Sequence, residues 1–443
     1  MVNRNLKNGR VILPYGRSFM ALVAAHSLGQ KGVEIIGCDS ADFTILSFSK
    51  YVKEHFIYPD FSENEDAFIE FMLSKVKELK PSDDRPYVLM PICKDYDVIA
   101  RHKEVFTPYI RVATADIEAI EKLHTKDNFA RTLKELDVDA PQTWLPEDEQ
   151  ELESMDLDFP VIIKPYNQTS GRGIHKVKNR EDLMKYWRDN QSKYGQKSLM
   201  QEHVEGKDYC LTGLFDHGEF RASMAYRNVY NFPPNDSGAG ILRETVPDER
   251  FRQIAADLMQ PLKWNGIAEF DFLWDEKEES SPVLLEVNTR FWGGLFQSVQ
   301  SGIDFPWLLY QLTVNGHVDQ AGQAEIGKRT KMPYIWLISA IKEAVNSDED
   351  FKQIEQKGRD ALNQMKSGKM WVGLKSYSIY LADYVSESLN IGKKTRRLNK
   401  ALAEGRDAED ELLNSEDPYA AFGILFVLGS LIRNGKLPPE VTF

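Results

Sequence analysis

Two apolar segments near the middle of the chain are each punctuated by acidic residues. They read GIAEFDFLW (266–274) and VLLEVNTR (283–290), and an acidic turn joins them. Side chains alternate between the two faces of a strand. Alternation places Glu269 and Asp271 on one face of the first strand, and Glu286, Asn288 and Arg290 on one face of the second. A solvated polar face would be the ordinary explanation, but carboxylates inside such apolar strands are costly to bury unpaired. The pattern therefore predicts paired strands with a functional acidic face.

Carboxylate and amide oxygens on neighbouring strands are suited to Mg²⁺, which keeps several waters and bridges nucleotide phosphates. Mn²⁺ accepts similar oxygen ligands. The carboxylates of these two strands are accordingly candidate metal ligands. Arg290 lies two residues beyond Asn288, and its planar guanidinium is suited to an anion beside the terminal phosphate.

Two lysines and a glycine-containing loop precede these strands. Lys126 opens a helical segment, TKDNFARTLKEL, and Lys164 ends an apolar strand, FPVIIKP. The loop 167–173 (NQTSGRG) follows at once, and its backbone amides can approach phosphate oxygens. It lacks the Walker pattern, and in isolation it reads as a hairpin turn.

The segment Leu199–Asp208 reads as a strand that passes into a polar connector. Such a connector can offer backbone groups to an adenine edge, and it can equally be a plain crossover between subdomains.

The N-terminal part alternates short apolar strands with helical segments. Residues 11–14 and 33–38 read as strands around a helix, and 87–91 reads as another strand after a helix at 63–80. This order predicts a small α/β domain with a parallel sheet. A nicotinamide or flavin role is rejected, because the turn Pro14–Ser18 holds one glycine where the dinucleotide fingerprint needs three.

Six segments, taken in chain order, resemble the ATP-grasp superfamily, in the branch of biotin carboxylase and carbamoyl phosphate synthetase. They are TKDNFA, FPVIIKP, SGRGI, MQEHVEG, EFDF and EVNTRFWGG. The resemblance covers roughly residues 114–316. It implies a mixed α/β and α+β fold: a pre-ATP-grasp parallel α/β domain (1–113), a two-subdomain ATP-grasp domain (114–320, lid about 140–200), and a mainly helical C-terminal region (321–443).

The resemblance also implies a role for each matching position. ATP phosphates would be held by Lys126, Lys164, Ser170, Gly171 and Gly173. Adenine and ribose would be held by Gln201, Glu202, Val204 and Asp208. The metal ions would be carried by Asp271, Glu286 and Asn288. The substrate carboxylate would be held by Arg290, with Arg227 and Arg243 adding anion contacts.

The chain departs from particular members of the superfamily. The stretch between Arg227 and Arg243 lacks the basic, glutamine-rich run of the biotin carboxylase branch, and no biotin-acceptor segment or glutamine-hydrolysing cysteine module is found. A carboxylate–amine ligase that forms an acyl phosphate and releases ADP is the better match. Two alternatives stay open: another ATP-grasp reaction, such as carboxylation or thioester formation, and a non-catalytic ATP-binding module.

Composition narrows the partners. The formal net charge is −13, which argues against a nucleic-acid partner held by a basic stripe. The longest apolar stretch, Ala420–Ile432, is shorter than a bilayer span, which argues against an integral membrane association. It predicts a buried C-terminal helix, with peripheral contact with a membrane as the alternative. Three cysteines without metal or redox spacing argue against a disulfide framework and a zinc site, and a cytoplasmic protein is expected. The resemblance implies small-molecule acid and amine substrates. The C-terminal region either completes the substrate pocket or makes a homo-oligomer contact.

Overall fold

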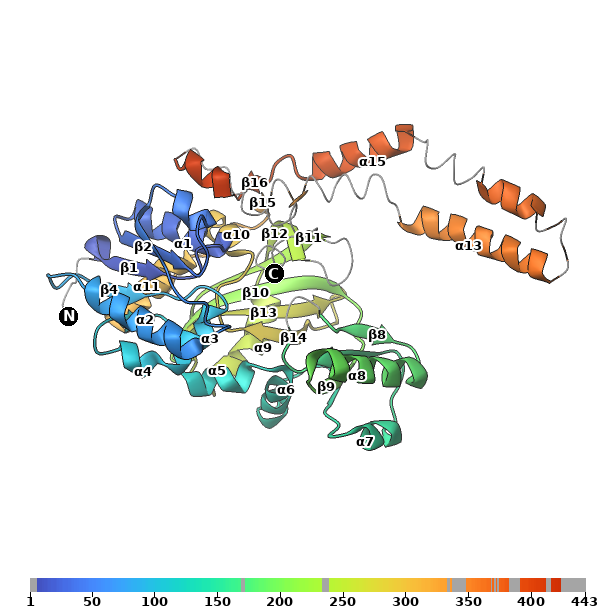
Figure 1. Cartoon of the computed structure of the whole chain (residues 1–443), viewed down its shortest axis with the longest axis horizontal. Helices are drawn as coiled ribbons and strands as arrows, with labels where there is room; N and C mark the ends of the chain where they lie inside the picture. The colour runs from blue at the N-terminus through green and yellow to red at the C-terminus, as the bar shows by residue number, and fades with distance from the viewer. Residues whose placement is uncertain are drawn as a thin grey trace.

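The structure is a computed structural model. It describes residues 6–168, 172–232, 239–332, 335–336, 348–367, 369, 372, 374–381, 391–411 and 416–423. Three sheets organise these residues: a parallel sheet near the N-terminus, a small antiparallel sheet, and a large mixed sheet (Figure 1).

The N-terminal sheet is entirely parallel, with the strand order β3-β2-β1-β4-β5. Its strands are β1 (Arg10–Leu13), β2 (Glu34–Asp39), β3 (Val52–Ile57), β4 (Tyr87–Leu89) and β5 (Arg111–Val112). The accompanying helices are η1 (Leu6–Asn8), α1 (Phe19–Gln30), η2 (Ile45–Phe48), α2 (Glu65–Glu78), α3 (Asp95–Arg101) and α4 (Lys103–Phe106). Asp39 is fully buried and accepts hydrogen bonds from the backbone and side chain of Arg17, so its carboxylate is already engaged.

The small sheet has the order β6-β9-β7-β8, with β6 (Thr143–Trp144), β7 (Val161–Pro165), β8 (His175–Val177) and β9 (Ser198–Glu202). Two helices belong to the same part of the chain, α7 (Glu149–Ser154) and α8 (Arg180–Tyr194). Helix α8 begins where the Asn179 side chain accepts a hydrogen bond from the Asp182 backbone, and it ends at Gly195 in the left-handed conformation. Before this sheet, α5 (Ile117–Leu123) precedes α6 (Lys126–Glu135), and α6 is the helical segment that the sequence predicts to open at Lys126.

The large sheet has the order β14-β13-β10-β11-β12-β15-β16. Its long strands are β10 (Lys207–Asp216), β11 (Glu219–Phe232), β12 (Ala239–Val246), β13 (Gly266–Trp274) and β14 (Val283–Asn288). Aromatic and aliphatic side chains of β10 and β13 pack with α6 and α9 (Glu249–Met259) in one apolar core. A second core joins α1 to α10 (Leu295–Gln300) and α11 (Phe305–Asn315), which ties the N-terminal domain to the large sheet.

The C-terminal region is mainly helical, with α13 (Asp348–Lys366) and α15 (Ile391–Glu404) extending away from the body in Figure 1. It also contributes two short strands that the sequence does not predict, β15 (Arg329–Lys331) and β16 (Glu409–Asp410), at the edge of the large sheet. Asp417 then reaches the N-terminal domain, where it accepts hydrogen bonds from the Ser49 hydroxyl (2.5 Å) and the Lys50 backbone (3.1 Å) and contacts His26 Nε2 (2.8 Å).

The predicted fold class is confirmed: a parallel α/β sheet is followed by antiparallel sheets and a mainly helical C-terminal region. The domain boundaries stay predictions. Of the predicted C-terminal helix at 420–432, residues 420–423 belong to η3 (Pro418–Gly423), and the remainder lies outside the described residues. Among the helices of the described ranges, none has the length and apolar character needed to cross a membrane.

Candidate active site

The acidic face is built by the antiparallel pairing of β13 and β14. Glu269 stands opposite Asn288, and Asp271 stands opposite Glu286. The Asn288 amide nitrogen donates to Glu269 Oε2 and to Asp271 Oδ2, each at 3.3 Å. The side chains that alternation assigns to one face thus meet across two strands.

Burial disfavours the charged forms of two carboxylates on this face. It raises the pKa of Asp271 well above its usual value, and the neighbouring carboxylates Glu269 and Glu286 raise it further. Burial likewise raises the pKa of Glu269, although the Tyr226 hydroxyl and Arg290 oppose this effect. A bound cation would relieve the repulsion between these acids.

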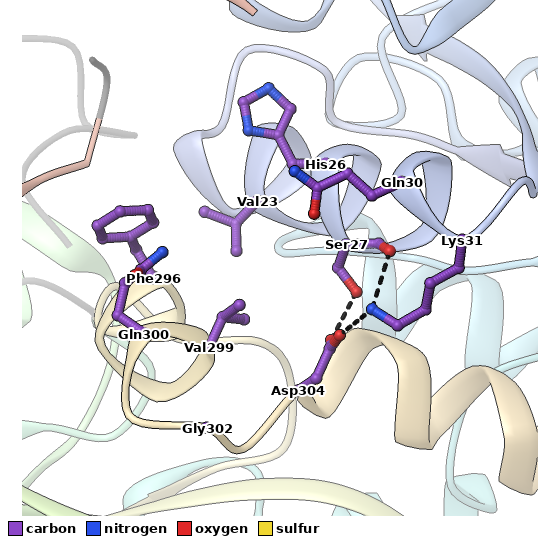
Figure 2. A pocket seen from close by; sticks show the side chains of 10 residues that line it. All are labelled: Val23, His26, Ser27, Gln30, Lys31, Phe296, Val299, Gln300, Gly302 and Asp304. Carbon is purple, nitrogen blue, oxygen red and sulfur yellow. Dashed lines mark hydrogen bonds and ion pairs between the residues drawn. The ribbon is translucent and has the colours of Figure 1, made fainter. Parts of the chain in front are cut away.

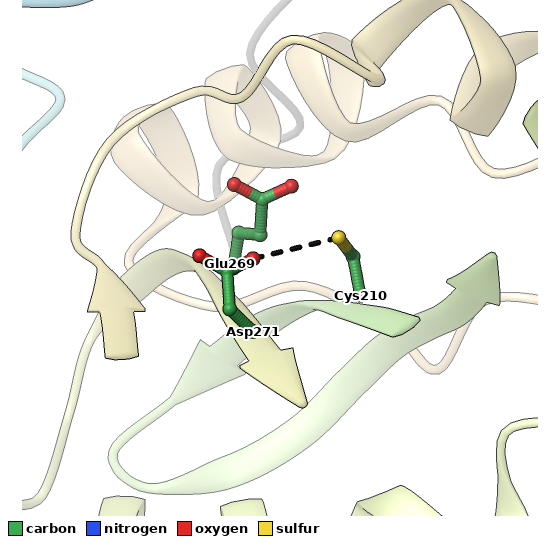
Figure 3. A group of neighbouring side chains, drawn as sticks. All are labelled: Cys210, Glu269 and Asp271. Carbon is green, nitrogen blue, oxygen red and sulfur yellow. Dashed lines mark hydrogen bonds between the residues drawn. The ribbon is translucent and has the colours of Figure 1, made fainter. Parts of the chain in front are cut away.

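Cys210 is a member of this cluster that the sequence analysis missed. It lies on β10 directly opposite Asp271, and its thiol donates to Asp271 Oδ1 at 3.4 Å. Figure 3 shows the thiol and the two β13 carboxylates, whose ligand atoms all lie within 4.8 Å of one another. Cys210 lies two residues after Asp208 on the same strand, so alternation could have assigned both to one face.

The donors fit Mg²⁺ or Mn²⁺. Asp271, Glu286 and Asn288 offer hard oxygen atoms on adjacent strands, and the raised pKa of Asp271 reflects burial beside the carboxylates Glu269 and Glu286. These three residues would hold the metal.

The first predicted phosphate lysine contacts the acidic face directly. Lys126 begins α6, and its ammonium donates to the Gln168 carbonyl at 2.9 Å and lies 3.1 Å from Glu286 Oε1. Burial opposes ionisation of Glu286, but the charges of Lys126 and Lys164 outweigh it and lower the pKa of Glu286. Glu286 therefore links the lysines to the metal face.

The second lysine lies deeper. Lys164 on β7 donates to the Gln201 side-chain oxygen on β9 at 2.7 Å, and the Gln201 amide donates to Thr143 Oγ1 at 3.1 Å. Burial lowers the pKa of Lys164 to about 8, and the nearby Lys126 charge acts in the same direction. An anion brought beside Lys164 would stabilise its charged form.

Both lysines border a cavity between α6 and the two antiparallel sheets. The cavity has an apolar lining with a polar rim, contributed by Lys126, Phe129, Ala130, Leu133, Thr143, Lys164, Leu199, Gln201 and Leu285. The cavity is small, about 10 Å³, and its apolar side chains lie beside a few polar groups.

The other predicted nucleotide residues lie at the end of β9, in β10 and in the connector between these strands. The Glu202 backbone N–H donates to the Gln142 carbonyl at 2.8 Å, and the half-buried Val204 lies in the connector between β9 and β10. Asp208 accepts a hydrogen bond from the Asn231 amide at 3.3 Å.

In the predicted glycine loop, Ser170 and Gly171 lie outside the described residues. Gly173 has a φ of +73°, and a Cβ there would approach the Pro165 ring to 2.6 Å. Its carbonyl accepts a hydrogen bond from the Asn190 amide at 3.0 Å. Glycine is therefore required here by backbone conformation and close packing.

The three predicted arginines lie in different surroundings. Arg290 follows β14, and its guanidinium donates to the Phe291 carbonyl at 2.8 Å. Burial lowers the pKa of Arg290, but nearby acidic groups, including Glu269, raise it by more. Arg227 pairs with Glu244 at 2.6 Å, and Arg243 pairs with Glu411 at 2.6 Å. The structure thus brings Arg290 to the acidic face, whereas Arg227 and Arg243 are engaged by other carboxylates.

A second cavity, of about 190 Å³, lies between α1 and α10 and contains none of the predicted site residues. Figure 2 shows Ser27 and Lys31 pointing toward Asp304, with hydrogen bonds of 2.5 Å from the Ser27 hydroxyl and the Lys31 ammonium. The Lys31 ammonium and the Asp304 carboxylate of this cavity are thus already paired with each other.

Comparison with known proteins agrees with this geometry. Residues 123–294 match the family model of the ATP-grasp domain. Over 191 residues the chain is 24% identical to the C-terminal section of the carbamoyl phosphate synthase large chain of Methanopyrus kandleri. That match covers 41% of this chain and 35% of the relative, so the chain spans about a third of that protein's length.

Two solved structures share the fold at low sequence identity. A biotin carboxylase from Campylobacter jejuni, in complex with a β,γ-ATP compound, superposes with a TM-score of 0.59 at 16% identity, covering 72% of this chain and 74% of that one. An L-amino acid ligase from Bacillus licheniformis superposes with a TM-score of 0.55 at 14% identity, covering 70% and 74%.

Proposed function

Because residues 123–294 form an ATP-grasp domain, we propose that the chain is an ATP-dependent carboxylate–amine ligase. One observation carries the proposal: the Lys126 ammonium lies 3.1 Å from Glu286, which stands directly opposite Asp271. A pair of lysines suited to phosphates therefore adjoins an acidic face suited to the metal that accompanies them. Arg290, two residues beyond Asn288, is a cation for a substrate carboxylate at the same edge.

The proposed reaction has two balanced steps. A substrate carboxylate oxygen attacks the γ-phosphorus of ATP, an O–P bond forms, and the bond to the ADP oxygen breaks. An amine then attacks the carbonyl carbon of the acyl phosphate, phosphate leaves, and the nitrogen loses a proton. Phosphoryl transfer depends mainly on positioning and charge neutralisation, so no nucleophilic side chain is needed.

Each group in the site has one task in this scheme. Lys126 and Lys164 hold phosphate oxygens, and the apolar side chains beside them, such as Phe129 and Leu285, contact the adenine. Mg²⁺, bound by Asp271, Glu286 and Asn288, would neutralise developing phosphate charge. Arg290 fixes the attacking carboxylate through two parallel hydrogen bonds.

An amine acceptor rather than bicarbonate is supported by the stretch between Arg227 and Arg243, which lacks the basic, glutamine-rich run of the biotin carboxylase branch. The partners would be a small carboxylic acid and a small amine. All three cysteines are buried free thiols, which is typical of a reducing compartment, so we assign the enzyme to the cytoplasm.

The test is an ADP-release screen of the purified chain against paired libraries of carboxylic acids and amines. ADP release that needs both an acid and an amine supports the proposal. Hydroxylamine in place of the amine should trap the acyl phosphate as a hydroxamate. ADP release that depends on bicarbonate or on a thiol acceptor would replace this function by another ATP-grasp reaction, and nucleotide binding without any turnover would replace it by a binding module.

A further inference from the structure

The Asn288 side chain can serve a metal only in one orientation. Its carbonyl oxygen can bind a cation, whereas its NH₂ group cannot. In the structure the NH₂ group donates to Glu269 and Asp271, each at 3.3 Å. The orientation of this amide therefore depends on the acceptors that hold its nitrogen.

Glu269 is a fixed acceptor. Its Oε2 receives the Asn288 hydrogen bond at 3.3 Å, and its Oε1 receives one from the Tyr226 hydroxyl at 2.6 Å. Glu269 and Tyr226 are 7% and 3% exposed, so water does not compete freely for these bonds. Both oxygens of this carboxylate are thus used within the protein.

Tyr226 is held in turn by the loop after Arg290. A Cβ built on Gly294 would lie 2.7 Å from both the Tyr226 hydroxyl oxygen and the ring carbon that carries it. The φ of Gly294 is −87°, which other residues adopt readily. This glycine therefore serves packing against Tyr226 rather than backbone conformation.

We propose that Glu269 is a positioning residue: held by Tyr226, it fixes the Asn288 amide so that the carbonyl oxygen is presented to the metal. The proposal rests on the metal site of the proposed function. It separates the tasks of two acids on one strand, since Asp271 binds the metal and Glu269 orients a ligand. Such outer partners commonly change metal affinity about 10- to 100-fold when removed.

The experiment measures Mn²⁺ binding to the full chain in the presence of ADP, by electron paramagnetic resonance of free Mn²⁺. Glu269→Gln keeps the side-chain size but replaces one of the two acceptor oxygens by an NH₂ group and removes the negative charge, so the Asn288 hydrogen bond is either lost or made to a neutral acceptor. The expected result is a Kd for Mn²⁺ raised about 10-fold or more. ADP affinity without metal should stay within about twofold, because an outer partner of the metal ligand does not contact the nucleotide.

Tyr226→Phe is the second variant, and it decides the case if Glu269→Gln fails to fold. It removes one hydroxyl and should weaken Mn²⁺ in the same direction by a smaller factor. If Glu269 were itself a metal ligand beside Cys210, freeing its Oε1 would leave Mn²⁺ affinity unchanged or strengthen it, and that result would overturn the proposal.

The matched controls are Glu276→Gln and Tyr209→Phe, since Glu276 also accepts a tyrosine hydroxyl but contacts neither Asn288 nor Asp271. Both should leave Mn²⁺ affinity unchanged. If the wild-type chain binds Mn²⁺ and ADP and the variants bind Mn²⁺ with an unchanged Kd, this inference alone is overturned. A wild-type chain that binds neither would remove the proposed function and the inference together.

Discussion

Asp271 and Glu286 stand directly opposite each other on β13 and β14, yet their pKa values move in opposite directions. Burial and the neighbouring acids raise the pKa of Asp271. Burial acts on Glu286 too, but Lys126 and Lys164 outweigh it and lower the pKa of that residue. Glu286 is therefore an anion at neutral pH before any metal arrives, and it joins the acidic face to the phosphate-binding side.

Replacing Glu286 with Gln should abolish ADP formation and leave the fold intact. The variant loses both a metal oxygen and the partner of Lys126, while a half-buried amide is tolerated at this position. Turnover at saturating Mg²⁺ and far-ultraviolet circular dichroism check the two statements. Glu279→Gln, in the exposed acidic turn, is the control. Near-normal turnover of the Glu286 variant would remove this residue from the metal site.

Lys164→Met should weaken ATP binding roughly 10- to 100-fold, the usual effect of losing a hydrogen bond to a charged group. The variant keeps the length of the side chain and removes a buried charge. Thermal stability at pH 7 should therefore not fall, because burial already disfavours the charged form of Lys164. Calorimetric titration with ATP and thermal unfolding measure both effects. Unchanged ATP affinity would make Lys164 an ordinary charge at the end of a strand.

ATP affinity should also fall as pH rises from 7 to 9. The pKa of Lys164 is lowered to about 8 by burial and by Lys126, so the ammonium that attracts phosphate is lost across this range. The stability of the empty fold should change in the opposite sense. Because the folded pKa lies below the unfolded value of about 10.4, the fold gains stability as pH rises from about 8 to that value. A pH series of ATP titrations on the wild type and Lys164→Met tests the assignment, since the variant should show a flatter profile.

Arg290→Lys should bind ATP almost normally and lose acid-dependent ADP release by a factor on the order of 10². Lysine keeps the charge but lacks the planar fork that fixes a carboxylate. Both quantities are measured on the same preparation. An equal loss of ATP binding and turnover would mean that Arg290 supports the fold or the nucleotide, and the substrate role would be withdrawn.

Arg243→Met should destabilise the protein by about 3–5 kcal/mol, because it leaves the Glu411 charge buried without its partner. The two side chains are only 3% and 4% exposed. Arg227→Met is the matched comparison: that side chain is 36% exposed, and the loss of its ion pair should cost less than about 1 kcal/mol. Denaturant titration measures both. A stable Arg243 variant that lost acid-dependent turnover would favour the catalytic role that the sequence predicts.

The sequence predicts the acidic face well because it depends on local alternation along two strands joined by a short turn. Glu269, Asp271, Glu286 and Asn288 need only that alternation to be assigned to one face. Cys210 was missed because β10 becomes a neighbour of β13 only through the pairing of distant strands.

Other contacts join residues that lie even farther apart in the sequence. Arg243 and Glu411 are 168 positions apart, and no local pattern connects them. The short strands β15 and β16 escaped prediction for a related reason. Each has two or three residues: β15 pairs with the edge of β12, and β16 pairs in turn with β15.

The contacts of Asp417 constrain the order in which the protein can mature. Asp417 meets His26 across 391 positions of sequence, and β16 completes the edge of the large sheet only a few residues earlier. Domains that finish early can fold while the ribosome is still elongating the chain. The buried groups of the first domain that contact Asp417 can be satisfied only after residue 417 has been translated. A nascent chain stalled before residue 409 should therefore hold an N-terminal domain more open to proteases than the same domain in the finished protein.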